Sequence, residues 1–349
     1  MKVTINGMPC PATKGQTILD VARANDVYIP TLCYHRNVGA HARCRACVVE
    51  VKGSPALVTS CNTQVTEGME IVTDSDRVLE AQRFVIKLIL SSGNHDCIIC
   101  EKTGACELQD AAYNLKIADT DIRREAFPPH YDESSAFIRV DHTRCILCER
   151  CLEACNHVVV NRVIKLIGRG YHAHIGFDSN DPMGESSCVQ CGECTQICPV
   201  GALTNKKSIG KARIWEVQRV RTTCPYCGVG CQLELHVKEG RIVKVTGVEK
   251  GLPNKGRLCV KGRYGYDFIY SKDRLTMPLI KENGTFREAS WDEALDLVAN
   301  RFREIIKKHG PDAIAGVSCA RSTNEDSYQM QKLFRAVIGT NNIDHCART

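Results

Sequence analysis

The sequence contains two groups of four cysteines with the same spacing, Cys145-x2-Cys148-x2-Cys151-x3-Cys155 and Cys188-x2-Cys191-x2-Cys194-x3-Cys198-Pro199. In a doubled run of this kind, three cysteines of each group bind one [4Fe–4S] cluster and the fourth binds the other cluster. The crossing predicts one cluster on Cys145, Cys148, Cys151 and Cys198, and a second on Cys188, Cys191, Cys194 and Cys155. Disulfides or a zinc ribbon are the alternatives, but the identical spacing of both groups disfavours them. We therefore interpret the stretch as an electron relay.

Length and composition limit the possible classes of protein. The chain has 349 residues and 22 cysteines, which suits roughly two to three domains that use cysteine for metal. No signal peptide opens the sequence, and its longest apolar patch, residues 84–90, is too short to span a bilayer, so a cytoplasmic protein is expected. The formal net charge of +6 counts cysteines as neutral, and cluster thiolates would offset it. We expect neither nucleic acid nor a membrane as a partner.

Residues 1–75 contain a second cysteine pattern. Strand alternation at Val3 and Ile5, an Asn6-Gly7 turn and a helix around residues 17–25 predict a small mixed domain. The pattern itself is Cys33-x10-Cys44-x2-Cys47-x13-Cys61, which follows the plant-type [2Fe–2S] layout with a longer first gap. Cys10 lies outside the pattern and is expected to be a small buried apolar residue.

Residues 76–140 contain a third pattern. Apolar residues at helical spacing predict a helix over 76–92 that ends at Gly93. It leads to His95-x-Cys97-x2-Cys100-x5-Cys106, in which imidazole would be the fourth ligand of a [4Fe–4S] cluster. The alternative for His95 is a helix cap or a surface residue. Residues 107–140 lack cysteine, include Pro128-Pro129, and are interpreted as a connector.

The doubled cysteine run belongs to residues 141–206. Its two halves are separated by an insert, in which residues 161–167 and 171–177 could pair as strands. Three histidines of the insert, His157, His172 and His174, are interpreted as surface or packing residues.

Residues 215–349 begin with a last cysteine group, Cys224-Pro225-Tyr226-Cys227-x3-Cys231, which Cys259 completes. A hairpin over residues 232–245, turning at Glu239-Gly240, separates the two parts. Lys261 follows Cys259 and is either a solvated surface residue or a bridge between the cluster and a larger cofactor.

The end of the chain has α/β character. A capping box at Ser290 opens an amphipathic helix that ends before Gly310. A strand over residues 312–318 then leads through a polar loop to a helix over 325–337. This arrangement is either an anion site or an ordinary crossover. The loop consists of Arg321, Ser322, Thr323 and Asn324.

With these residues assembled, the chain resembles the catalytic subunit of cytoplasmic molybdenum- or tungsten-dependent formate dehydrogenases. Residues 1 to about 205 resemble the iron–sulfur head shared with the large subunit of respiratory complex I and with iron-only hydrogenases. Residues from about 215 resemble the first part of a pterin-dependent oxidoreductase domain. The most specific pieces are Cys224-Pro225-Tyr226-Cys227-Gly228-Val229-Gly230-Cys231, Cys259-Val260-Lys261-Gly262, Arg321-Ser322-Thr323-Asn324-Glu325 and Asn341-Asn342-Ile343-Asp344-His345-Cys346-Ala347-Arg348.

The resemblance implies an α+β multidomain iron–sulfur protein. Its parts are a plant-type ferredoxin-like [2Fe–2S] domain (1–75), a His/Cys cluster segment with its connector (76–140), a bacterial two-[4Fe–4S] ferredoxin domain (141–206) and the start of a pterin-oxidoreductase α/β domain (215–349). One [2Fe–2S] and four [4Fe–4S] clusters are implied, together with a molybdenum or tungsten bis-molybdopterin guanine dinucleotide in the full-length protein. Cys10, Cys319 and Cys346 are the cysteines outside the cluster motifs.

The implied reaction is the interconversion of formate and carbon dioxide. Electrons would pass along the clusters to diaphorase-type subunits that bind flavin and NAD(P), or to ferredoxin-linked subunits. In the family, the lysine that matches Lys261 links pterin to the nearest cluster, and residues 321–324 match a cofactor-binding loop. The metal ligand, cysteine or selenocysteine, would follow Thr349, so a UGA codon is expected there and this chain alone is expected to be inactive.

Two departures and three alternatives accompany the resemblance. The family often places its ligand histidine four residues before the first cysteine, whereas His95 is two residues before Cys97. The chain also ends where the family places its metal ligand. The alternatives are an iron-only hydrogenase, a complex I-type subunit without a working pterin site, and an electron-transfer module without catalysis of its own.

Overall fold

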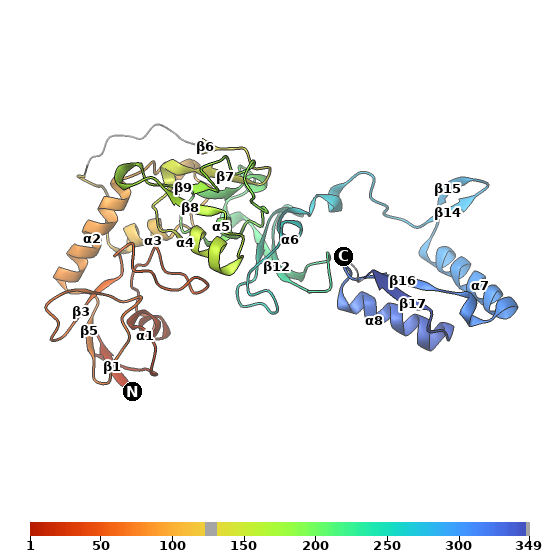
Figure 1. Ribbon diagram of the computed structural model, residues 1–349, viewed down its shortest axis with the longest axis horizontal. Helices are drawn as coiled ribbons and strands as arrows, with labels where there is room; N and C mark the ends of the chain where they lie inside the picture. Colours follow the sequence, from red (N-terminus) through yellow and green to blue (C-terminus); the bar gives the residue numbers. More distant parts are fainter. Residues whose placement is uncertain (123–130, 347–349) are drawn as a thin grey trace. The chain divides into compact units, whose positions relative to one another are not determined.

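The computed structural model describes residues 1–122 and 131–346. It divides into two compact units, one of residues 1–218 and 238–244, the other of residues 219–237 and 245–349. Figure 1 labels the helices and strands of both units along the chain. The Pro128-Pro129 pair and residues 347–349 lie outside the described residues.

The first unit begins with a five-stranded sheet of order β2-β1-β5-β3-β4. β1 pairs antiparallel with β2 and parallel with β5, and the helix α1 (Ile18–Ala24) follows a capping box between Thr17 and Asp20. Alternating residues of β1 and the inner face of α1 form one buried core, as the sequence pattern predicts. Cys10 is 2% exposed in this core, which confirms its predicted role as an apolar residue. The strands are β1 (Lys2–Ile5), β2 (Met8–Pro11), β3 (Val48–Val51), β4 (Val58–Thr59) and β5 (Glu70–Val72).

Two helices follow the sheet. The predicted helix over 76–92 is α2 (Asp76–Ser91), whose N-cap Ser75 accepts a hydrogen bond from Val78 N–H. The side chain of Gln82 donates to the carbonyl of Val48 at 2.9 Å, which fixes α2 against β3. The second helix, α3 (Glu107–Asn114), lies in the stretch interpreted as a connector, so that stretch is more structured than the sequence indicated.

A three-stranded sheet supports the doubled cysteine run. Its order is β10-β7-β6, and both pairings are antiparallel. The two helical segments that follow the cysteine loops are α4 (Arg150–Glu153), which continues as a wider turn to Val158, and α5 (Glu193–Ile197). The predicted strand pair of the insert is present as β8 (Ile164–Ile167) and β9 (His174–Phe177). The strands of the sheet are β6 (Tyr131–Asp132), β7 (Ile138–Asp141) and β10 (Leu203–Asn205).

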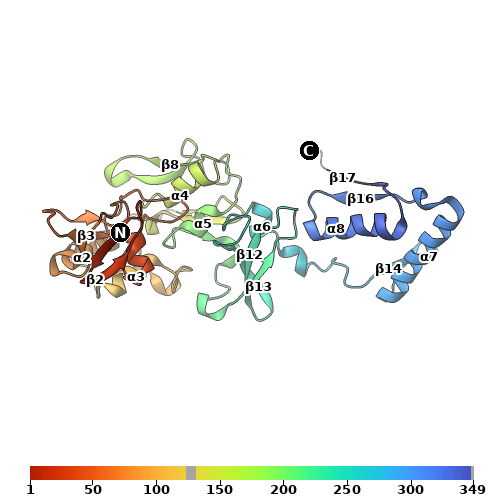
Figure 2. The same ribbon diagram turned by 90° about the horizontal axis from the view of Figure 1, so that it is seen from below.

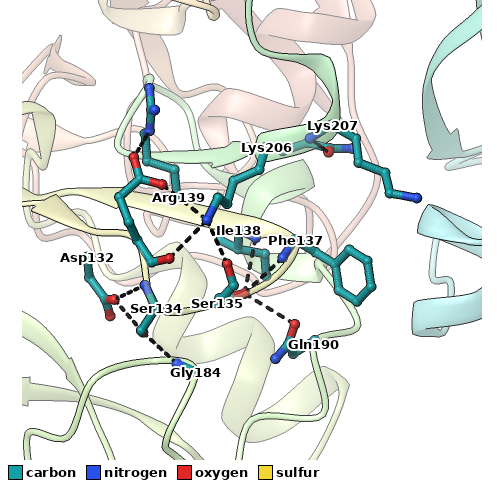
Figure 3. Close-up of polar contacts among 12 residues, drawn as sticks. Asp132, Ser134, Ser135, Phe137, Ile138, Arg139, Gly184, Gln190, Lys206 and Lys207 are labelled. Atoms are coloured by element: carbon teal, nitrogen blue, oxygen red, sulfur yellow. Dashed lines mark hydrogen bonds and ion pairs between the residues drawn. The ribbon is translucent and has the colours of Figure 1, made fainter.

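Polar contacts around Ser135 hold this sheet to the second cysteine loop (Figure 3). The hydroxyl of Ser135 accepts hydrogen bonds from the N–H groups of Phe137 and Ile138 and donates to the side chain of Gln190 at 3.2 Å. Lys206 Nζ donates to the carbonyl oxygens of Glu133 and Ser135. Because Gln190 lies between Cys188 and Cys191, these contacts position that cysteine loop on the sheet.

The last cysteine group is built around a sheet of order β11-β12-β13. The strands are β11 (Gln218–Thr223), β12 (Gln232–Lys238) and β13 (Arg241–Gly247), and the last two turn at Glu239-Gly240 as predicted. A short helix, α6 (Val260–Tyr264), follows Cys259. The antiparallel pair β14 (Leu279–Glu282) and β15 (Thr285–Glu288) comes next.

The end of the second unit is a strand–helix–strand unit. Helix α7 (Trp291–His309) begins at N-cap Ser290 as predicted, and β16 (Gly316–Cys319) is shorter than the predicted 312–318 strand. Helix α8 (Asn324–Lys332) continues as a wider turn to Ile338, and β17 (Ile343–Cys346) pairs parallel with β16. In both views α8 lies beside these strands (Figure 1 and Figure 2).

A small apolar core joins these elements. Ile314, Phe334 and Ile338 are buried, and the C-terminal half of α7 packs on them through Phe302, Ile305 and Ile306. A Cβ at Gly316 would lie 2.5 Å from the ring of Phe334, so only glycine permits this approach of β16 to the helix. The N-terminal half of α7 differs from the prediction, since Leu295 and Val298 are 59% and 49% exposed.

Candidate metal centres

The loop between α1 and β3 gathers the first cysteine group. Cys33 and Cys47 are each 1% exposed, and Cys61 is buried beside them. A hydrogen bond from the Cys44 thiol lowers the pKa of Cys33 to about 5, and one from Cys61 lowers the pKa of Cys47 to about 6. The pKa values of their partners, Cys44 and Cys61, are raised, so each pair keeps one proton and holds one negative charge. Such a charge is suited to an iron cluster, whose metal ions are positive.

The second group lines a single cavity. His95, Cys97, Cys100 and Cys106 all contribute to its lining. The Nε2 atom of His95 is buried and has no hydrogen-bond partner among the described residues. A buried ring nitrogen without a partner is costly, and a metal ion would satisfy it. The structure therefore brings the predicted histidine to the three predicted cysteines.

Close contacts define the walls of this cavity. A Cβ at Gly201 would lie 2.6 Å from Cys100 Sγ, so the chain after Cys198 can approach the cavity only without a side chain. Arg213 Nη1 donates to the carbonyl of Cys100 at 2.9 Å. Arg144 lines the cavity, and its Nε forms an ion pair with Asp141 Oδ2 at 2.8 Å. The sequence reading missed these residues, because nothing in the cysteine spacing indicates which distant residues touch the loop.

The two halves of the doubled run pack against each other through α4 and α5. Burial raises the pKa of Cys148, and the charge of Cys198 raises it further, which places the two sulfurs close together. The pKa of Cys188 is raised by burial and also by Cys191 and Cys155. These influences across the two halves agree with the crossed ligand sets, which stay a prediction.

Four cysteines of the doubled run are buried, namely Cys148, Cys151, Cys194 and Cys198. Desolvation raises the pKa of Cys145 to about 12, and Cys151 has a pKa raised well above its ordinary value. Several thiolates cannot share such a site unless positive charge compensates them. Iron in a cluster supplies that charge, so this donor set fits the [4Fe–4S] clusters that the spacing predicts.

The last group comes together within the second unit. Burial raises the pKa of Cys224, and Cys259 and Cys227 raise it further, so the returning cysteine lies with the first two. Burial also raises the pKa of Cys231, and the charges of Cys224, Cys227 and Cys259 raise it further. A Cβ at Gly262 would lie 3.4 Å from Cys224 Sγ, so the start of α6 lies directly against this group.

The predicted cofactor loop adjoins that group. The N–H of Gly228 lies 3.5 Å from the carbonyl of Ala320, and a Cβ at Gly228 would lie 3.3 Å from Asn324 Oδ1. Thr323 caps α8 by accepting a hydrogen bond from Asp326 N–H, and the Asp326 carboxylate accepts one from Thr323 N–H. The first turn of α8 therefore already contains a carboxylate, which makes it a weaker anion site than the sequence indicated.

Within residues 1–122 and 131–346, no three His, Cys, Asp or Glu side chains converge closely enough to hold a single metal ion.

Five family models match the chain in succession. Residues 1–76 match a 2Fe-2S iron-sulfur cluster binding domain, and residues 82–121 match the NADH-ubiquinone oxidoreductase-G iron-sulfur binding region. Residues 135–204 match the ferredoxin-like domain of NADH-quinone oxidoreductase subunit 3. Residues 217–271 match the molybdopterin oxidoreductase Fe4S4 domain, and residues 274–349 match molybdopterin oxidoreductase. The chain belongs to the molybdopterin oxidoreductase family.

These matches confirm the predicted fold class, a mixed α and β iron–sulfur protein that leads into a molybdopterin oxidoreductase domain. They also support [2Fe–2S] and [4Fe–4S] clusters together with a pterin-bound metal as the cofactors of this family. The individual ligands and the domain boundaries at residues 75, 140 and 206 stay predictions.

Curated relatives match this chain over nearly its whole length. It is 36% identical over 99% of its length to "Probable oxidoreductase YjgC" of Bacillus subtilis, and 36% identical over 100% to "NADPH-Fe(3+) oxidoreductase subunit alpha" of Geobacter sulfurreducens. It is 34% identical over 99% to a "Putative formate dehydrogenase" of Staphylococcus aureus. The chain spans 39% to 40% of the length of these relatives.

A solved structure shares part of the fold. A chain of an NAD+-reducing [NiFe]-hydrogenase in the H2-reduced state superposes with a TM-score of 0.57 and 31% identity, covering 61% of this chain and 90% of the other. No helix in the described part of the chain is long and apolar enough to cross a membrane.

Proposed function

We propose that this oxidoreductase chain is the N-terminal part of a formate dehydrogenase catalytic subunit. The observation that carries the proposal is the contact between the Cys227-Gly228 loop and residues 320–324. It puts a cluster-binding loop against the loop that resembles a pterin contact. Electrons released at a pterin-bound metal could then enter the cluster at Cys224, Cys227, Cys231 and Cys259 without crossing a wide gap.

Formate and carbon dioxide are the proposed substrate pair. The support is the name of the Staphylococcus aureus relatives, together with the resemblance of residues 341–348 to the run that precedes the metal ligand. When bound, a molybdenum or tungsten pterin centre supplies the two-electron chemistry of such a reaction. Lys261 would place a positive charge between that centre and the Cys224 group, and residues 321–324 would hold the cofactor.

The first unit supports a role as an electron path to a partner. Its cysteine groups follow one another along the chain, and its matches are to domains of NADH-quinone oxidoreductases. The solved relative is a chain of an NAD+-reducing enzyme. We therefore propose a flavin- and NAD(P)-binding subunit, or a ferredoxin-linked one, as the partner, with [2Fe–2S] and [4Fe–4S] clusters as the relay.

A second candidate function is an electron-transfer module that does not act on formate. The Geobacter sulfurreducens relative favours this candidate, because its name describes NADPH as the reductant and ferric iron as the acceptor.

One experiment separates the two candidates. The full-length protein, loaded with clusters and metal, is mixed anaerobically with formate or with NADPH, and cluster absorbance is followed. We expect formate, and not NADPH, to bleach the clusters. In protein with bound pterin, each further addition of formate should bleach the clusters at the same rate. Bleaching by NADPH with none by formate would reject the formate proposal and favour the electron-transfer module.

A further inference from the structure

Arg150 is a buried cation inside a cysteine motif. It lies on α4 between Cys148 and Cys151, and its side chain is 1% exposed. A charge so completely removed from water is costly unless it is paired and hydrogen-bonded. An arginine at this place therefore needs a reason beyond packing.

The charge is paired from one side. Arg150 Nη1 and Nη2 donate to Glu107 Oε1 and Oε2 at 2.6 and 2.5 Å, which is a bidentate pair. The Glu107 side chain is 41% exposed, so water screens its charge more than that of Arg150. The Nε–H of Arg150 is buried and has no acceptor among the described residues.

This ion pair connects three cysteine groups. Glu107 follows Cys106 of the His95 group, and its N–H donates to the carbonyl of Pro199, next to Cys198, at 3.0 Å. Arg150 itself lies between two cysteines of the first ferredoxin group. Its charge also helps to lower the pKa of Cys33 in the [2Fe–2S] group, although the Cys44 hydrogen bond is the larger cause.

A fixed positive charge in such a site acts on electron transfer. Reduction of a [4Fe–4S] cluster adds one electron and makes the cluster and its thiolates one unit more negative. A nearby buried cation stabilises the reduced form more than the oxidised form, because a low-dielectric interior strengthens the attraction. Glu107 is more exposed than Arg150, so water weakens its opposing effect on the cluster.

We propose that Arg150 raises the reduction potential of the cluster bound by Cys145, Cys148, Cys151 and Cys198. The inference rests on cluster binding as proposed above, but it does not depend on formate as substrate. Glu107 counteracts Arg150 and limits the size of the effect.

The test is a redox titration of the cluster-loaded full chain with dithionite, followed by electron paramagnetic resonance without formate. The signal of this cluster is assigned as the one altered in Cys148→Ser. We expect Arg150→Gln to shift its reduction equilibrium at least tenfold towards the oxidised form, about 59 mV for one electron. Glu107→Gln is expected to shift it in the opposite direction, and Arg150→Lys, which keeps the charge, to stay within a few-fold of the parent protein.

Arg169→Gln is the matched control, because it removes the same charge from an exposed position in the same domain. An unchanged potential in Arg150→Gln with intact clusters would overturn the inference, as would an equal shift in Arg169→Gln. If Arg150→Gln fails to bind clusters, Glu107→Gln decides: a raised potential supports the inference and an unchanged one overturns it. If these shifts occur but the parent protein does not oxidise formate, the result would count against the proposed substrate and not against the role of Arg150.

Discussion

Lys261 is the residue through which the second unit places positive charge beside its cysteine group. Its ammonium nitrogen lies 6.0 Å from the ring centroid of Tyr226, which separates Cys224 from Cys227. Burial raises the pKa of Cys224, and the charge of Lys261 acts against that rise. Lys261 therefore stabilises negative charge on this group.

We expect Lys261→Ala in the full-length protein to slow cluster reduction by formate at least tenfold and to leave thermal stability within a degree or two. The side chain contributes charge rather than core packing, so its loss changes coupling more than folding. Lys261→Arg should rescue only in part, since a planar guanidinium does not replace a compact ammonium. Stopped-flow absorbance checks this, with the exposed Lys272→Ala as control. Unchanged turnover with an artificial acceptor would argue against the role.

The proposed ligation of iron by His95 leads to a prediction about iron content. His95→Ala removes the buried Nε2 that has no partner, and we expect the chain to lose about four irons, one [4Fe–4S] cluster. His95→Cys should restore most of that iron, because thiolate is the commoner ligand. Anaerobic iron and sulfide analysis measures both variants. His157→Ala, at a side chain that is 75% exposed, should keep full iron content; full iron content in His95→Ala would exclude ligation.

At the scale of elements, Asp132 on β6 fastens the insert to the sheet. Its Oδ2 accepts from Met183 N–H at 2.6 Å, its Oδ1 accepts from Ser134 N–H, and Ser134 Oγ accepts from Gly184 N–H (Figure 3). Burial acts to raise the pKa of Asp132, but these hydrogen bonds outweigh it and the net pKa is lowered. The carboxylate therefore stabilises the fold above its ordinary pKa of about 3.9, and this contribution is lost as pH falls through the lower folded value.

We expect Asp132→Asn to speed amide hydrogen exchange at Met183 and Gly184 several-fold at neutral pH, where the carboxylate is charged. The amide side chain is a weaker acceptor than a carboxylate. Exchange mass spectrometry on peptides covering residues 178–187 provides the measurement, and the exposed Glu185→Gln is the control. Equal exchange in Asp132→Asn and the parent would show that the turn is held by other contacts.

The parallel pairing of β16 and β17 can be tested through its cysteines. Cys319 and Cys346 face each other in register, and their Sγ atoms are 3.4 Å apart. We expect mild treatment with diamide to remove two electrons and two protons from the pair and to form one S–S bond, which needs an approach to about 2.05 Å. Peptide mass spectrometry detects the link. Two results would contradict the register. One is the absence of a Cys319–Cys346 link in the parent chain, and the other is a link from Cys346 to another cysteine that persists in Cys319→Ser.

The elements with strong local signals could be predicted from the sequence. Helix α2 follows from its apolar spacing, and the β12–β13 hairpin follows from its Glu239-Gly240 turn. Helix α3 was missed because only Leu108 and Ala111 are buried in it and no side chain caps it. Strand β17 was missed because its sequence, Ile-Asp-His-Cys, is mostly polar and its pairing with β16 depends on distant residues.

The candidate sites show the same division. Spacing alone predicts a group for each motif cysteine, because a cluster motif is a local feature. Arg150, Glu107 and Gly201 meet those groups only through the tertiary fold, so no spacing rule could have found all three. A charged residue between two motif cysteines, as at Arg150, is the one signal that the sequence offered.

At the scale of the whole molecule, the cysteine groups predict the metal content. One [2Fe–2S] and four [4Fe–4S] clusters hold about 18 irons, and we expect anaerobic analysis of the reconstituted chain to approach that number. Chain concentration is determined by amino-acid analysis, and a sample denatured before reconstitution is the control. A value near ten per chain would refute the full set, because at least two of the five groups would then be empty.

The crossed cysteines also fix an order of events during protein synthesis. A ribosome delivers Cys145, Cys148 and Cys151 well before Cys198, which the spacing predicts to be the fourth ligand of the same cluster. Iron delivered to the nascent chain at that moment would meet an incomplete ligand set. With the predicted crossed ligands, neither cluster can be completed before translation has passed the second cysteine group. One ligand set is complete at Cys194 and the other at Cys198.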